Sequence, residues 1–489
     1  MIAILKREWK SYFQNITGWL FIAAVLALYG LYFLAYNLRA GYPYVSYTLS
    51  AISFIMLIAV PILTMRSMAE ERHSRTDQLV LTAPVSLGKM IFGKFLAMVG
   101  VFTVAVAVIA VTPLVLAAFG TVPMGENYVA VLGFWLYGCT CIAVGMLASA
   151  LTESQVIAAV VAFAFLFLGY MMNSITGLIG DHLITKVLGA YDLYTPLQSF
   201  MSGCLDLTGV VYFVSVTALC LFLTCQCVQK RRWSMTTKKL TTGMFSVAMI
   251  VVGFAVAVAV NLVVKEMPSS WTAVDATSTK LYSLTDTTKD YVKNLSQDVT
   301  IYVLSSEKSA DSTLAETLQR YEDLSKHLNV VYKDPAKSPN FYQQYTDSAP
   351  SQNSMIVVSD ARSRVVDYSD IYEYSYDYST YSSSVDGYDA EGQLTSALQY
   401  VTKADSELPV IYEITGHGEN TLSGGFSEAV EKANMTVSQL TLLTEDAVPD
   451  DAAAIIINGP TSDFSEDDAA KVKEYLQGGG RALITCNFE

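Results

Sequence analysis

Hydrophobic residues are concentrated in the first half of the chain, in runs long enough to cross a membrane. A membrane-spanning helix needs about 20 largely apolar residues. Seven runs meet this requirement, and they predict spans at 18–36, 45–65, 95–119, 127–151, 155–177, 208–228 and 243–264. The first six predict one bundle, and a short basic linker, residues 229–242, separates them from the seventh.

The residues before the first run have a helical pattern of their own. Apolar residues recur at helical spacing from Ile2 to Ile16, and Lys6, Arg7 and Lys10 occupy the other side. An amphipathic helix of this kind is typical of the membrane interface. A soluble N-terminal helix is the alternative, but the direct continuation into the first span favours the interface.

After residue 265 the pattern changes to short apolar runs that alternate with helical periodicity. We predict helices at 314–328, 426–434 and 465–477, and strands at 299–304, 330–333, 355–358, 364–366, 410–414, 453–457 and 482–485. The strands at 355–358 and 364–366 read as a hairpin, and the last three runs are typical of buried parallel strands. The second half is therefore an α/β domain, doubly wound in its last part.

Composition and charge support this two-part organisation. The 489 residues are 52% hydrophobic and only 16% charged, whereas about 25% charged residues is typical of soluble proteins. Residues 1–264 carry a net charge of +6 and residues 265–489 a net charge of −20. An acidic second half argues against a nucleic-acid partner.

The distribution of Lys and Arg predicts the orientation of the spans, because these residues mark the cytoplasmic side. With the N-terminus inside, thirteen Lys and Arg residues fall in cytoplasmic segments and only Arg39 and Lys186 in external ones before residue 265. We therefore expect a multi-pass protein of the plasma membrane with a cytoplasmic N-terminus. Residues 265–489 would then be extracytoplasmic.

Candidate chemistry inside the predicted spans is sparse. No Asp, Glu, Lys, Arg or His lies deep in the apolar runs, where an ion-coupled transporter normally carries one. This favours an energy source in another subunit. Four His and seven Cys favour neither a metal site nor a disulfide framework, and we expect no cofactor.

The segment between the second and third runs, residues 65–95, is long, cytoplasmic and mixed in charge. Thr76 can cap a short helix that Pro84 ends, and Leu79 gives it an apolar contact. A surface helix there is well placed to dock on a partner. A solvated basic loop that only fixes the topology is the alternative, and charge alone does not decide between them.

The order of residues in this segment resembles the ABC type-2 permease family, as does the run Thr195-Pro196-Leu197 with Phe200 before the sixth span. The resemblance covers residues 1–233. It implies a coupling helix in the cleft of a separate ABC ATPase subunit, within a bilayer and beside a second copy or a paired permease. The implied contact residues are Glu70, Glu71, Arg72, Thr76, Leu79 and Pro84. The loop at 152–154 is too short for more than a small second contact.

Motifs in the second half resemble the auxiliary ectodomain of gliding-motility-type ABC transporters. They are Lys280-Leu-Tyr-Ser-Leu-Thr, Asp334-Pro335, Ile414-Thr-Gly-His-Gly-Glu419, Asn458-Gly459-Pro460 and Gly478-Gly479-Gly480. The resemblance implies a flavodoxin-like or glutamine-amidotransferase-like sheet. We expect domains at 1–233, 234–264, 265–400 and 401–489, with the sheet cut short at the last residue.

Three features of the second half invite other interpretations. A catalytic pair of Cys486 and His417 is disfavoured, because Cys486 lacks a nucleophile elbow and a turn explains His417 better. Residues 422–426 mimic an ATPase signature, but the chain has no phosphate loop, so Ser423 reads as a helix cap. Tyrosine-rich residues 367–389 suit either a binding loop or an unfolded polar insertion, and we favour the insertion.

The sequence therefore predicts a non-enzymatic membrane permease of an ATP-driven ABC export system, with a fused extracytoplasmic accessory domain. The alternative is a membrane-anchored scaffold or binding component of an envelope or motility complex. A membrane-tethered hydrolase is a weaker third hypothesis. We expect the ectodomain to bind or scaffold rather than to catalyse.

Overall fold

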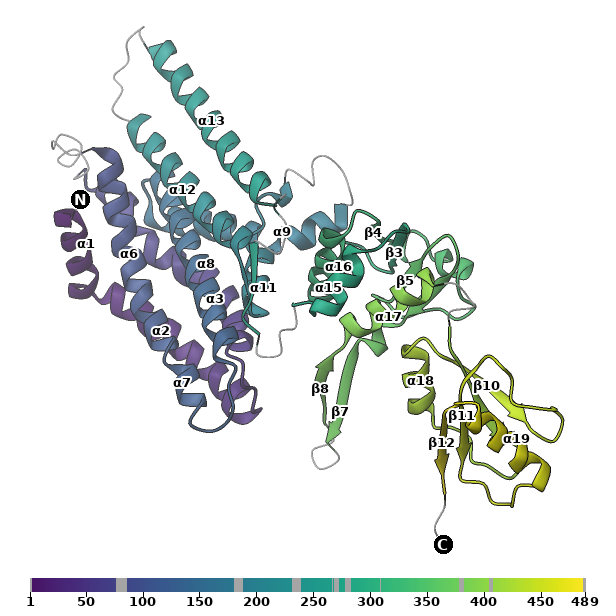
Figure 1. Ribbon diagram of the computed structural model, residues 1–489. Coiled ribbons are helices and arrows are strands. Elements are labelled where there is room, and N and C mark those ends of the chain that lie inside the picture. The colour runs from purple at the N-terminus through teal and green to yellow at the C-terminus, as the bar shows by residue number, and fades with distance from the viewer. Residues whose placement is uncertain are drawn as a thin grey trace. The chain divides into compact units, whose positions relative to one another are not determined.

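The computed structural model describes residues 2–75, 86–179, 188–230, 239–265, 267, 272–277, 283–307, 309–377, 382–403 and 408–486. The chain divides into two compact units, Met1–Ser283 and Leu284–Glu489, and we describe each by itself. Long helices make up the first unit, and mixed α/β sheets make up the second (Figure 1).

Within the described residues, seven helical stretches are long and apolar enough to cross a membrane, which confirms the seven predicted spans. They cover Ile16–Arg39, Ser46–His73, Leu87–Leu116, Met124–Leu151, Gln155–Gly177, Leu207–Gln229 and Ala248–Lys265. The third span begins at Leu87 rather than near residue 95, so Lys94 lies inside a helix. The predicted N-terminal helix is also confirmed, as α1.

The helices of the first unit are α1 (Ile2–Gln14), α2 (Ile16–Phe33) with the π-helix η1 (Leu34–Arg39), α3 (Ser46–Thr64), α4 (Arg66–His73), α6 (Leu87–Ile109), α7 (Thr112–Leu116), α8 (Met124–Leu151), α9 (Gln155–Ile179), α11 (Thr195–Met201), α12 (Leu207–Lys230) and α13 (Lys239–Lys265). A short antiparallel pair, β1 (Cys204–Asp206) and β2 (Ala273–Asp275), completes this unit.

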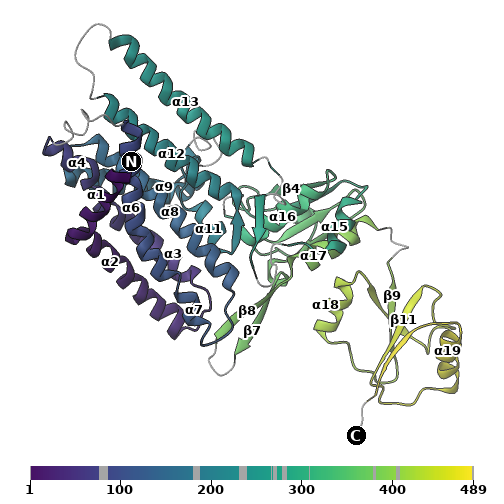
Figure 2. The ribbon, with the colours of Figure 1, turned by 60° about the vertical axis from the view of Figure 1, so that its left-hand side comes forward.

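Helix α8 is the centre of the bundle and packs against α3, α6, α9 and α12 (Figure 2). Glycines on α8 allow neighbouring side chains to approach its backbone. A Cβ atom on Gly138 would lie 2.2 Å from the Phe102 ring, and one on Gly133 would lie 2.3 Å from Phe200 Cβ. These glycines therefore let the neighbouring helices pack closely against α8.

Helix α13 packs along α12, and none of its spanning window is buried. Its polar contact with α12 is a hydrogen bond of 2.7 Å from Asn261 Nδ2 to Ser215 Oγ. Its exposed Val, Leu and Phe side chains suit a lipid environment, since apolar residues around a whole helix are stable only in apolar surroundings.

The first part of the second unit has a four-stranded sheet in the order β4 (Leu328–Tyr332), β3 (Val299–Val303), β5 (Met355–Val358) and β6 (Ser363–Val366). Strands β3 and β4 are parallel, and β5–β6 is the predicted antiparallel hairpin. Helices α15 (Asp286–Lys293), α16 (Ser312–Leu324) and α17 (Ala390–Thr402) contribute to its core.

The expectation of an unfolded insertion at 367–389 was wrong. The segment contains an antiparallel hairpin, β7 (Tyr372–Asp377) and β8 (Ser382–Tyr388). At its base the rings of Tyr368, Tyr372 and Tyr388 contact one another, with centroids 5.4 and 5.2 Å apart. Tyr368, Tyr372 and Tyr388 thus pack against the core of the first sheet.

The last part is a four-stranded parallel sheet in the order β10 (Thr436–Thr441), β9 (Val410–Thr415), β11 (Ala452–Asn458) and β12 (Ala482–Thr485). Helix α18 (Gly424–Lys432) and helix α19 (Glu466–Gln477) cover opposite faces, because Ile456 packs with Val430 while Ile457 packs with Val472. This is the predicted doubly wound arrangement. The expected burial of the last strand was wrong, since every residue of β12 is exposed.

Candidate functional site

The most elaborate polar structure of the membrane unit surrounds α4, at the end of the second span. Helix α3 contains Pro61 and ends at Thr64, and α4 begins at Arg66. The first amides of a helix have no partner within that helix. Here Ser149 of α8 provides one: its Oγ accepts hydrogen bonds from Met68 N and Ala69 N, at 3.2 and 3.1 Å. The same hydroxyl donates to Met65 O at 3.0 Å.

The last turns of α8 are shaped for this contact. A Cβ atom on Gly145, one turn before Ser149, would lie 2.3 Å from Thr64 Oγ1. The close approach of α8 to the end of α3 therefore requires glycine. Ser149 is fully buried. Water does not reach this position, so the hydroxyl of Ser149 is what satisfies the two amides.

Four charged side chains form a ring between α1, α4 and α6. Lys94 Nζ of α6 lies 2.7 Å from Glu71 Oε1 of α4 and 3.6 Å from Glu8 Oε1 of α1. Arg7 Nη2 lies 2.6 Å from Glu8 Oε1 and 3.5 Å from Glu71 Oε1. Lys94 Nζ also donates to Ser67 O at 3.1 Å. The ring is electrically neutral, which allows Lys94 to be only 3% exposed.

The carboxylates of the ring favour the charged form of Arg7. The hydrogen bond with Glu8 raises the pKa of Arg7 above its already high value, and the charges of Glu8 and Glu71 add to this effect although burial opposes it.

Helix α1 itself is anchored on α6 by an apolar contact, since a Cβ atom on Gly100 would lie 1.7 Å from Trp9 Cζ3.

Two further charged side chains of α4, those of Arg66 and Arg72, link the helix to its neighbours. Arg66 makes a bidentate contact with Glu70, with both N···O distances 2.8 Å, and its Nη1 donates to Thr17 Oγ1 of α2 at 3.3 Å. Arg72 Nη2 lies 2.8 Å from Glu153 Oε1 in the short loop after α8. Helix α4 is thus tied to α1, α2, α6 and α8.

The structure therefore places half of the predicted contact residues. Glu70, Glu71 and Arg72 lie together on α4, while Thr76, Leu79 and Pro84 fall outside the described residues. Sequence reasoning missed the partners Glu8 and Lys94 and the capping role of Ser149. An acidic residue within the basic face of the N-terminal helix and a lysine directly before the third predicted run were the available signals.

In the second unit, His417 was the principal candidate for chemistry, and the structure shows both of its ring nitrogens beside carboxylates. Nδ1 lies 3.2 Å from Glu419 Oε1, and Nε2 lies 3.3 Å from Asp468 Oδ2. The backbone N–H of His417 donates to Glu419 Oε2 at 2.7 Å. The imidazole stacks on Phe464, with ring centroids 3.9 Å apart, and the residue is only 5% exposed.

The surrounding hydrogen bonds lie at the ends of β9 and β11, where open α/β sheets usually bind ligands. His417 O accepts from Thr461 N and Ser462 N, both at 3.0 Å. The Ser465 hydroxyl donates to Asp468 and lowers the pKa of that carboxyl, with the imidazole of His417 adding to the shift. These contacts describe a packed turn rather than an open catalytic site.

Ser423 caps α18 as predicted, accepting a hydrogen bond from Phe426 N at 3.4 Å.

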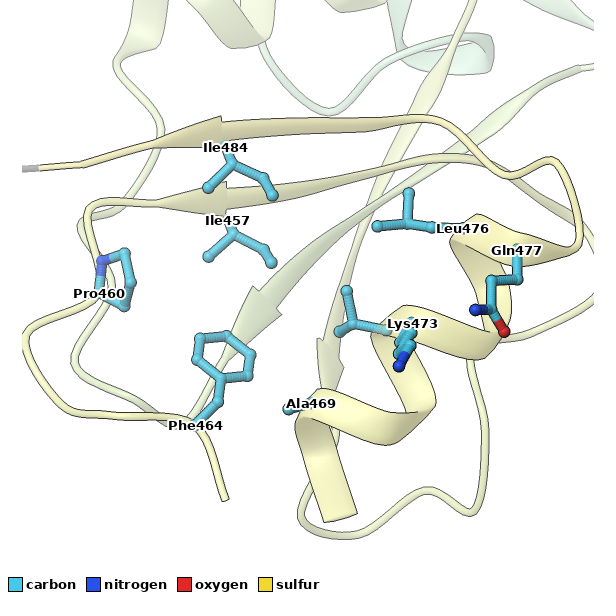
Figure 3. Close-up of a pocket in the computed structure, with 9 residues that line it drawn as sticks. Ile457, Pro460, Phe464, Ala469, Lys473, Leu476, Gln477 and Ile484 are labelled. Carbon is cyan, nitrogen blue, oxygen red and sulfur yellow. The ribbon is translucent and has the colours of Figure 1, made fainter. Parts of the chain in front are cut away.

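An apolar pocket of about 510 Å³ lies between α19 and strands β11 and β12 (Figure 3). Ile457, Phe464 and Ile484 contribute to its walls, and its polar side chains, Lys473 and Gln477, come from α19. Ligand sites normally have several polar groups that converge from different elements, so we assign no ligand to it. In the described part of the chain no group of three His, Cys, Asp or Glu side chains is placed to hold a metal ion.

Seven spans, with the close-packed α8 at the centre of the bundle and charged groups gathered at one end of the second span, indicate a multi-pass membrane protein. Comparison with family models indicates which family of membrane proteins this unit resembles. Residues 39–228 match the model of ABC-2 family transporter proteins, and residues 278–371 match a domain of unknown function (DUF7088). Neither a curated protein nor a solved structure matches the chain. Residues 39–228 are thus similar to the permease domain of ABC-2 transporters, which supports a membrane permease of an ABC system.

Proposed function

We propose that this chain is the membrane permease of an ATP-driven ABC export system, and that the ATPase is a separate chain. The match of residues 39–228 to ABC-2 transporters supports the proposal. The observation that carries it is the attachment of α4 to the bundle, through Ser149 of α8, Lys94 of α6 and Glu153 in the loop after α8. A helix held this firmly can pass force from residues 76–85, which follow it, into the spans.

The predicted contact residues of α4 differ in their availability to an ATPase. The side chain of Glu70 is 43% exposed, whereas that of Glu71 is 21% exposed and lies against the buried Lys94. We therefore expect Glu70 to meet Arg or Lys side chains of the ATPase. Leu79 would supply an apolar anchor of the kind that dominates many interfaces, and Arg72, Thr76 and Pro84 would surround it.

Co-purification tests this docking. We expect Glu70→Ala and Leu79→Ala to reduce the amount of ATPase recovered with the full-length chain while membrane insertion stays normal. Leu31→Ala is the matched control, since Leu31 lies on α2 and is 63% exposed. Normal recovery and normal stimulation of ATP turnover with both test variants would contradict the assignment.

We place the N-terminus in the cytoplasm and residues 265–489 outside, on the strength of the Lys and Arg distribution. Protease added to intact spheroplasts should then remove the second unit and leave α1 intact. Digestion of the second unit only after lysis would reverse the topology.

We further propose that the second unit is an auxiliary domain of the gliding-motility type that binds or scaffolds. The carboxylates beside both ring nitrogens of His417 support a structural role for this residue. A thiol- or serine-directed activity probe should label the wild-type domain no more strongly than the His417→Ala variant. Labelling that disappears in both His417→Ala and Cys486→Ala would instead indicate a hydrolase.

A further inference from the structure

The charged ring at α1, α4 and α6 has two possible pairings of nearly equal geometry. In the observed pairing Lys94 contacts Glu71 at 2.7 Å and Arg7 contacts Glu8 at 2.6 Å. In the alternative pairing Lys94 contacts Glu8 and Arg7 contacts Glu71, and these distances are already 3.6 and 3.5 Å. Each alternative contact is about 0.9 Å longer than the observed one.

The ring is closed through one oxygen of each carboxylate. Glu8 Oε1 faces both Arg7 and Lys94, and Glu71 Oε1 faces both as well. An exchange of partners therefore needs only small displacements and leaves each charge beside an opposite one. The neighbouring pair of Arg66 and Glu70 is bidentate and mutually satisfied, so it does not compete for Lys94.

Burial determines which member of the ring needs a partner most. The side chain of Lys94 is 3% exposed, those of Glu8 and Glu71 are 16% and 21% exposed, and that of Arg7 is 57% exposed. A buried ammonium group without a carboxylate is strongly unfavourable, whereas Arg7 can turn toward water. Helix α4 can therefore leave α6 easily only if Lys94 has a second carboxylate to contact.

The apolar contacts indicate which helix supplies that second carboxylate. The indole of Trp9 lies directly over Gly100 and leaves no room for a Cβ atom there, so α1 is seated on α6. Glu8 precedes Trp9 in the sequence and is held beside Lys94 by this seating. Glu71 is on α4, which leads toward the segment that we propose to dock on the ATPase.

We propose that Lys94 is the pivot of a two-position clasp, in which its ammonium group exchanges between Glu71 on α4 and Glu8 on α1. When α4 moves, Glu8 takes over Lys94 and the exposed Arg7 follows Glu71, so no buried charge loses its partner. Glu8 and Lys94 act as positioning residues, because they contact no substrate. The inference rests on the proposed function for the source of the movement, but the exchange itself is a property of the full-length chain.

Amide hydrogen exchange of α4 in the purified full-length protein tests the clasp without an ATPase. Glu8→Gln removes the second carboxylate, so release of α4 from α6 becomes harder, and we expect exchange at the α4 amides that Ser149 does not hold, such as those of Glu70 and His73, to slow by about fivefold or more. Glu71→Gln leaves Lys94 with Glu8 alone, so we expect exchange at the same amides to accelerate by a similar factor. Glu153→Gln, at a pair outside the ring whose carboxylate is 64% exposed, is the matched control for loss of one charge.

The opposite signs distinguish a clasp from static attachment. If the ring merely holds the helices together, both Glu8→Gln and Glu71→Gln will accelerate exchange, and that result would overturn the proposal. Unchanged exchange in both variants would also overturn it. In the complex with the ATPase, Glu8→Gln should bind the ATPase normally but lower its turnover. Failure of the wild-type chain to bind any ATPase would overturn the proposed function, while the exchange experiment would still decide the clasp.

Discussion

Replacement of Ser149 by alanine tests whether one hydroxyl of the fourth span holds the end of the second. The substitution keeps the Cβ atom, so packing between α8 and α3 changes little. It leaves the N–H groups of Met68 and Ala69 without their partner, and these residues are 6% and 0% exposed. Each buried donor left unpaired costs about 1–3 kcal/mol. We therefore expect Ser149→Ala to lower the free energy of unfolding by about 2–5 kcal/mol.

Equilibrium unfolding in mixed micelles measures this loss, and amide exchange at Met68 and Ala69 shows whether it arises at α4. Thr224→Val is the matched control, since Thr224 is equally buried and its hydroxyl donates to Cys220 O within its own helix. It leaves no N–H group unpaired, so we expect a loss below about 1 kcal/mol. Equal losses in the two variants, or unchanged exchange at α4 in Ser149→Ala, would refute the role of Ser149 as a cap from another helix.

Further predictions concern packing and charge in both units. Gly138→Ala places a methyl group against the buried ring of Phe102 and should destabilise the bundle by about 1–3 kcal/mol, whereas Gly30→Ala, which meets nothing within 4 Å, should not; thermal unfolding of both variants checks this. Burial disfavours the charged form of Asp367, but four hydrogen bonds from two serines hold its pKa well below its usual value. The stabilisation that charged Asp367 provides is therefore present above about pH 4 and is lost as the pH falls further. Amide exchange measured across this pH range should show a smaller loss of stability in Asp367→Asn. His417→Ala leaves two carboxylates short of a partner and should lower the unfolding temperature of the second unit at neutral pH.

The seven spans were predictable because each is a run of about 20 apolar residues, a signal that depends on composition alone. The start of the third span was not, since Lys89 and Lys94 lower the local hydrophobicity. The helix tolerates Lys94 there because carboxylates reach it from two other helices, and such contacts are invisible to a local pattern. Ser149 is a small residue within the fourth span, and size alone does not reveal a hydrogen bond to amides that follow Pro61 by several residues.

The α/β strands were predicted most reliably where both faces are buried. The strand β11 has three consecutive buried isoleucines, and its position was predicted to within a residue at each end. The strand β10 was missed because it lies at the edge of its sheet and most of its side chains are partly or fully exposed, as the sequence Thr-Val-Ser-Gln-Leu-Thr reflects. The position of β12 was predicted correctly, but its exposure was not. An apolar sequence favours burial, but a strand is buried only where another element packs against it.

The attachments of α4 differ in strength, and this difference decides how a movement of the helix is shared among its neighbours. The hydrogen bonds to Ser149 are buried away from water, and through one short side chain they link the backbone of α4 to α8. They therefore resist separation of α4 from α8. The contact of Arg72 with Glu153 is exposed, and such pairs contribute only about 0–1 kcal/mol. The contact of Glu71 with Lys94 is intermediate in strength, because the carboxylate of Glu8 on α1 can take the place of Glu71. A force on α4 therefore reaches α8, the central helix of the bundle, while the contact with α6 can change partners.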